Sequence, residues 1–124
     1  MATSAWMLVG ATLLASPPSP DEYLSHGDVA QVVTVQRPNV IARCWLAGAP
    51  SAATRAGELG LVTTRVVVSL AIQPSGRTSD VRAKADDARF DGVARCVAAE
   101  VRGWRFRATR TTTHVNVPFV LRTP

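Results

Sequence analysis

Two histidines and a pair of adjacent carboxylates are the side chains with which this sequence could perform acid–base chemistry: His26, His114, Asp86 and Asp87. His26 falls in an expected linker. His114 falls on one face of an expected strand, where an exposed histidine without a catalytic role is the commoner case. Aspartates directly before a helical pattern are explained by helix capping. The glycines of residues 57–60 lack the lysine and the preceding strand of a phosphate-binding loop. The sequence therefore predicts that the protein is not an enzyme and has no cofactor or metal.

The two cysteines, Cys44 and Cys96, are 52 positions apart, and neither belongs to a CxxC pair. Because no histidine lies near either of them in the sequence, a zinc site is poorly supported. Both fall on the apolar faces of expected helices, which leaves two interpretations open. They are either two reduced cysteines in the core or a disulfide formed in an oxidising compartment. A disulfide-closed ring of this length would stabilise the fold by about 4 kcal/mol.

The size and charge of the chain set broad limits on its function. Its 124 residues are enough for one domain with a modest core. Lys and Arg number 14 against 9 for Asp and Glu, the formal net charge is +5, and every cation except Lys84 is arginine. This charge would suit an anionic partner such as a membrane surface or nucleic acid, although a solvated basic surface is its commoner meaning.

The N-terminal stretch, residues 1–15, is apolar and uncharged, and a proline-rich run ends it. It is too short to span a bilayer, which needs about 20 residues. It resembles the hydrophobic part of a secretory signal without the usual basic residue at its start, and a disordered leader is the alternative. We assign residues 1–27 to a signal-like or anchor-remnant leader with a linker, and residues 28–124 to the domain. This leader predicts a location in the periplasm or cell envelope, close to a membrane.

A two-residue period dominates residues 61–73 and predicts a strand. Its apolar face consists of Val66, Val68, Leu70 and Ile72. Because the second face is only partly polar, we expect an inner strand. Residues 74–76, Pro-Ser-Gly, supply a turn. Residues 77–85 then form the charged second arm of a hairpin.

A first helical pattern precedes this hairpin. Asp28 is its expected N-cap, with Gln31 completing a capping box, and the residues before Asp28 are expected to be linker. Pro38 predicts a kink or two short helices, because proline removes a backbone donor inside the pattern. Residues 48–60 are small and contain glycine, so we expect a loop there.

A second helix is expected from about residue 88 to residue 103, capped by Asp86 or Asp87. Its predicted buried stripe consists of Phe90, Val93, Val97, Val101 and Trp104. Trp104 and Phe106 are expected to close the end of the core.

The last strand is expected at residues 114–122, where Val115, Val117, Phe119 and Leu121 share one face. Pro118 cannot donate to a ladder, so this strand should lie at a sheet edge. We therefore predict an α+β fold of order α-β-β-α-β, with a three-stranded antiparallel sheet whose first strand is central and whose one face is covered by both helices.

Several of these pieces together resemble a known family. They are Ile41-Ala-Arg-Cys44-Trp45, residues 66–77 of the hairpin, Cys96, Trp104-Arg-Phe106 and Val117-Pro-Phe119-Val. This set is similar to the AgmX/PglI C-terminal domain, known from gliding-motility proteins and related to the TonB C-terminal fold, over about residues 28–122. The family usually has tyrosine where Trp45 stands. The resemblance implies a Cys44–Cys96 disulfide, a core motif of Trp45, Trp104, Phe106 and Phe119, and a non-enzymatic, envelope-facing module.

The expected function is binding of another envelope protein through an exposed strand edge. The predicted docking residues are Thr113, His114, Val115, Asn116 and Val117. A covered edge, with residues 107–112 lying over it, is the alternative at this position. Rival functions are a structural module that homodimerises through the same edge and a cationic binder of nucleic acid or anionic lipid. No specific nucleic-acid partner is expected, because the aromatic residues are assigned to the core.

Overall fold

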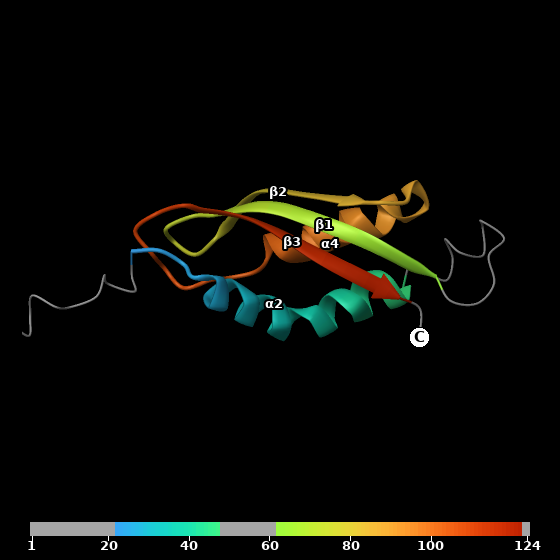
Figure 1. Cartoon of the computed structure of the whole chain (residues 1–124), viewed down its shortest axis with the longest axis horizontal. Helices are drawn as coiled ribbons and strands as arrows, with labels where there is room; N and C mark the ends of the chain where they lie inside the picture. Colours follow the sequence, from blue (N-terminus) through green and yellow to red (C-terminus); the bar gives the residue numbers. More distant parts are fainter. Residues whose placement is uncertain (1–21, 48–61, 123–124) are drawn as a thin grey trace, which may run out of the picture.

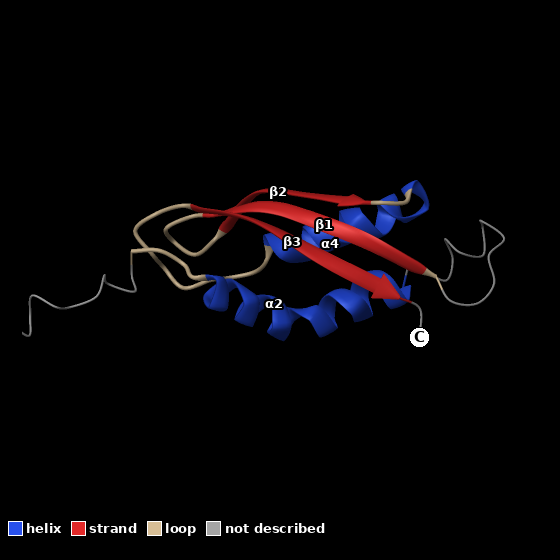
Figure 2. Cartoon of the chain, viewed as in Figure 1, coloured by secondary structure: helices blue, strands red, loops and turns tan. Residues whose placement is uncertain are grey.

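The computed structural model describes residues 22–47 and 62–122 (Figure 1). A three-stranded antiparallel sheet has the order β2-β1-β3, from the strands β1 (Thr63–Ile72), β2 (Thr78–Ala85) and β3 (Thr113–Arg122). The helices α2 (His26–Val40) and α4 (Asp91–Arg102) lie on one face of this sheet (Figure 2). The predicted α+β fold and its central first strand are confirmed.

The central strand β1 follows its two-residue period. Val66, Val68, Leu70 and Ile72 are all buried on the helix-covered face. On both sides β1 is hydrogen-bonded to a neighbouring strand, so that the sheet has β2 and β3 as its two edges. Half-buried Val67 belongs to the opposite, outer face of the sheet.

The hairpin between β1 and β2 depends on two special backbone positions. Gly76 has φ +89°, a conformation that glycine adopts without strain. Asp80, with φ +51°, lies where β2 has one residue more than β1, between the pairs Ser69↔Arg82 and Ala71↔Ser79. This β-bulge restores Val81 to the core face, so the second arm still contributes to the core.

The first helix starts earlier than expected. Ser25, and not Asp28, is the N-cap: its hydroxyl accepts from the Asp28 backbone N–H at 3.1 Å, and the Asp28 carboxylate accepts from the Ser25 N–H at 2.9 Å. The predicted cap was therefore wrong by three residues, because Asp28 occupies the acidic position of the capping box rather than its first position. Leu24, expected in a linker, is buried in the core.

Of the two effects predicted for Pro38, a division into two helices at this residue is not found, because α2 continues past it to Val40. A five-residue π-helical segment, η1 (Ile41–Trp45), follows directly. Its widened turn is shown by the Leu46 N–H, which donates to the Ile41 carbonyl. Cys44 and Trp45, which are adjacent in the sequence, both lie in the core.

The second helix matches its predicted stripe, although its first turn is a 3₁₀ segment, η2 (Ala88–Phe90), capped by Asp87. All five predicted stripe residues are buried: Phe90, Val93, Val97, Val101 and Trp104.

The four aromatic residues of the expected core motif, Trp45, Trp104, Phe106 and Phe119, are likewise buried. Ring centroids lie 6.3 Å apart for Trp104 and Phe119. A single core therefore holds the helices against the sheet.

A disulfide joins Cys44 of η1 to Cys96 of α4, with Cα atoms 5.5 Å apart. The pairing implied by the family resemblance is present in this structure. Residues 1–21 of the expected leader and the loop expected at residues 48–60 lie outside the described residues. Among the helices of the described part, none has the length and apolar content needed to cross a membrane.

Candidate functional site

β3 is one of the two edge strands of the sheet, and its outer edge has backbone groups without a strand partner. β1 directs alternate backbone groups to its two neighbours, and the Arg65 carbonyl accepts from the Asp86 N–H on the β2 side. Arg65 is opposite Val120 of β3, but its backbone groups point toward β2, so these two residues are not hydrogen-bonded to each other. Val120 and the other even-numbered residues of β3 therefore direct their N–H and C=O groups away from β1. The odd-numbered residues, such as Val115 and Val117, bond to β1.

Side-chain contacts confirm this alternation and close one half of the edge. The guanidinium of Arg37 donates to the Val120 carbonyl at 3.1 Å. The indole Nε1 of Trp45 donates to the Arg122 carbonyl at 2.6 Å. The α2–η1 unit therefore caps the C-terminal half of the β3 edge.

Pro118, like Val120, is an even-numbered residue of β3, so its backbone nitrogen, which carries no hydrogen, faces the free edge. No ladder bond to β1 is lost, which is why proline is tolerated here. The prediction that Pro118 marks an edge strand is confirmed.

The N-terminal half of the edge borders a groove with a volume of about 640 Å³. One wall is formed by β3 residues 113–118 and the other by the N-terminal half of α2. The helix residues that line it are His26, Val29, Ala30, Val33 and Thr34, with Leu24 and Ser25 at its end. We call this the edge groove. It is mainly apolar, because Val29 and Val33 are only partly covered by the core.

All five residues predicted as a docking edge line the edge groove: Thr113, His114, Val115, Asn116 and Val117. Their side chains divide between the two faces of the sheet. Val115 and Val117 face the helices, whereas His114 and Asn116 lie on the outer face, where the Ser69 hydroxyl donates to Asn116 Oδ1 at 2.7 Å. The α2 wall was not predicted. The signal that could have indicated it is the helical apolar pattern that precedes the hairpin.

The loop considered as a cover, residues 107–112, does not line the edge groove. It binds the segment before α2 instead: Arg107 donates to the Tyr23 carbonyl at 2.8 Å and to the Asp28 carboxylate at 3.0 Å. The Thr111 hydroxyl donates to the Glu22 carbonyl at 2.8 Å. The backbone N–H of Ser25, followed by Arg107, lowers the pKa of Asp28 below its usual value. Residues 107–112 therefore hold the segment at one end of the edge groove in place and do not cover the rest of the groove.

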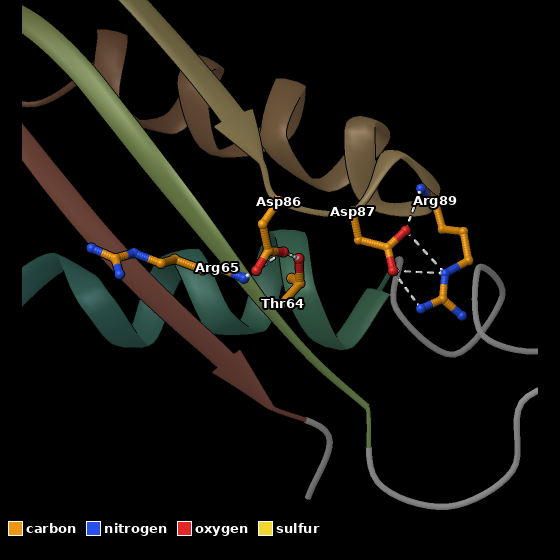
Figure 3. Close-up of polar contacts among 5 residues, drawn as sticks. All are labelled: Thr64, Arg65, Asp86, Asp87 and Arg89. Carbon is orange, nitrogen blue, oxygen red and sulfur yellow. Dashed lines mark hydrogen bonds and ion pairs between the residues drawn. The ribbon is translucent and has the colours of Figure 1, made fainter.

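The adjacent carboxylates of Asp86 and Asp87 do not act as a pair, because each binds different residues (Figure 3). Asp86 accepts from the Thr64 hydroxyl at 2.8 Å and from the Arg65 N–H at 3.1 Å. Asp87 caps η2 and forms an ion pair with Arg89. The Arg65 N–H, with a smaller contribution from Thr64, lowers the pKa of Asp86. These interactions keep Asp86 ionised and fasten the end of the hairpin.

Within residues 22–47 and 62–122, no three of the histidine, cysteine, aspartate and glutamate side chains are grouped so that they could hold a metal ion. Comparison of the chain with protein-family models, curated proteins and solved structures finds no match. The edge groove is therefore the best-defined candidate site, and its chemistry is that of backbone hydrogen bonding beside an apolar wall.

Proposed function

We propose that this chain is a non-enzymatic interaction module of the cell envelope. It binds an extended segment of a partner protein, which adds as a strand beside β3. One observation carries the proposal: outward-directed backbone groups at His114, Asn116 and Pro118 run along an apolar groove.

The available backbone groups define how long the added strand can be. His114 and Asn116 each offer an N–H and a C=O, whereas Pro118 offers only its carbonyl. Beyond Pro118, the carbonyls of Val120 and Arg122 already accept from side chains. A partner therefore pairs with residues 114–118 and then leaves the edge.

The α2 wall sets the side-chain pattern of the partner. In a strand, alternate side chains point to the same face, so every second side chain of the segment would face Val29 and Val33. Small apolar residues suit these positions. Because a backbone hydrogen bond contributes only about 1 kcal/mol net, these apolar contacts must supply much of the affinity.

The location and the family are part of the same proposal. The Cys44–Cys96 disulfide is compatible with an oxidising compartment such as the periplasm. The resemblance to the AgmX/PglI C-terminal domain agrees with an envelope-facing binding module, and a link to gliding motility would follow from it.

The decisive variant is Asn116→Pro, because it removes an outward N–H without touching the β1–β3 ladder. Val115→Pro is unsuitable, since the Val115 N–H faces β1 and its loss would weaken the sheet. Asn116→Ala is the matched control: it removes the side chain and keeps the backbone donor.

The partner can be captured with a photo-reactive amino acid at Thr34, which is exposed and lines the groove. In envelope preparations we expect the same cross-linked product from the parent and from Asn116→Ala, and its loss in Asn116→Pro. Folding of each variant is checked by thermal melting. An Asn116→Pro variant that folds and yields the full product would contradict docking at β3.

Homodimerisation through the same edge is the competing use of this surface. Sedimentation analysis of the purified chain separates the two. If the chain forms a dimer and Asn116→Pro converts it to a monomer, the segment that binds beside β3 belongs to a second copy of this chain and not to another protein.

A further inference from the structure

The outer face of the sheet, opposite the helices, carries four exposed basic residues: Arg65, Arg82, Lys84 and Arg122. The strand register places them around a small apolar centre. Val67 of β1 lies between Lys84 of β2 and Pro118 of β3, and it pairs with both. Arg65 of β1 pairs with Val120 of β3. In Figures 1 and 2, neither labelled helix lies on this side of the sheet. We call this surface the outer face.

The ion pairs of the described residues lie away from the outer face. Ion pairs on the helical side and its flanking segments join Arg43 to Glu100, Arg89 to Asp87 and Arg107 to Asp28. In the part of the chain that the structure describes, none of the four outer-face side chains forms an ion pair. The outer face thus carries four cations whose charge is not offset by a direct ion pair.

Two acidic residues, Asp80 and Asp86, lie near the outer face and offset part of its positive charge. The Asp86 carboxylate is occupied by the Thr64 hydroxyl and the Arg65 backbone N–H. Figure 3 shows the Arg65 guanidinium extending away from that carboxylate. Asp80 lies at the bulge, beside Arg82 in a shallow hollow. The balance of four cations to two anions leaves the face positive.

The residues between the four cations indicate which class of anionic partner suits the outer face. Val67, Pro118 and Val120 form a small apolar centre, with Val120 42% exposed. Proteins that bind single-stranded nucleic acid usually place aromatic rings on such a sheet to stack with bases. Here the tryptophans and phenylalanines of the described residues are in the core. Basic residues around small apolar side chains suit the headgroup region of a membrane instead.

We propose that the outer face binds the surface of an anionic lipid bilayer. Each cation close to an anionic leaflet contributes about fivefold to partitioning, so four of them give a reversible, salt-sensitive attachment. The β3 edge remains free at the side of the sheet, so a membrane-attached molecule could still bind an extended partner segment.

The test measures partitioning of the purified chain onto vesicles of phosphatidylcholine, with and without phosphatidylglycerol, at low salt. The outer-face variant combines Arg82→Gln and Lys84→Gln. The control combines Arg95→Gln on α4 with Arg110→Gln in the loop before β3, which removes the same net charge from other surfaces. Thermal melting establishes that both variants fold.

We expect binding only with phosphatidylglycerol, a loss of about 30-fold in the outer-face variant and a much smaller loss in the control. Equal losses in the two variants would show an effect of net charge and would overturn the assignment. Absence of phosphatidylglycerol-dependent binding would overturn it as well. Tighter binding to a thymidine oligonucleotide, weakened by the outer-face variant, would assign the face to nucleic acid instead.

Discussion

The indole Nε1 of Trp45 donates a 2.6 Å hydrogen bond to the carbonyl oxygen of Arg122, the last residue of β3. Together with the bond from Arg37 to Val120, it occupies the C-terminal half of an edge that would otherwise be open. An exposed strand edge is an aggregation hazard unless it is shortened or covered. The protein covers one half with helix side chains and leaves the other half beside the edge groove.

Removal of the Cys44–Cys96 disulfide should lower the free energy of unfolding by about 4 kcal/mol, the value for a ring of this length. The variant Cys44→Ala/Cys96→Ala is compared with the oxidised parent by urea unfolding. A reducing agent should destabilise the parent and leave the variant unchanged. Equal stability of the oxidised parent and the variant would show that the cross-link contributes nothing.

Trp104→Ala should cost about 3–5 kcal/mol of stability, because it empties a buried site at the end of the core. Trp104→Phe is the informative control. The Trp104 Nε1 atom is buried without a hydrogen-bond partner in the described part of the structure, so its removal loses no bond, and this variant should be affected much less. Arg82→Ala should leave the melting temperature nearly unchanged, since Arg82 is exposed.

Gly76→Ala should destabilise the hairpin strongly. A Cβ atom at this position would overlap the Phe106 carbonyl oxygen, and φ is +89°. Phe106 itself donates from its N–H to the Gly76 carbonyl at 2.9 Å, so the clash would separate the turn from the segment that follows α4. Gly92→Ala is the opposite case: its site is in α4 and has space, and the change should stabilise by up to about 1 kcal/mol. Thermal melting of both variants tests the contrast.

Stability should fall in acid because Asp86 and Asp28 have pKa values below their usual range in the folded state. A lowered folded-state pKa means that the unfolded chain binds protons first, so both contributions are complete above about pH 4 and are lost below it. Asp86→Asn should reduce the slope of melting temperature against pH in that window. An unchanged slope would show that the bonds from Thr64 and Arg65 do not stabilise the charged carboxylate.

The local patterns of this sequence determined most of its architecture. The alternation at Val66, Val68, Leu70 and Ile72 placed a strand, and Pro118 placed β3 at an edge. These predictions succeeded because burial of one face imposes a period on neighbouring residues, and a missing donor excludes an inner position.

Only the tertiary structure decided where α2 begins, that it continues past Pro38, and which part of the β3 edge is left free. Ser25 and Asp28 both suit a helix start, and the contacts of Arg107 and Thr111 secure the segment that precedes it. The two bonds that close the edge join residues 83 and 77 positions apart. Local periodicity carries no information about such pairs, because they form only after the helices have packed on the sheet.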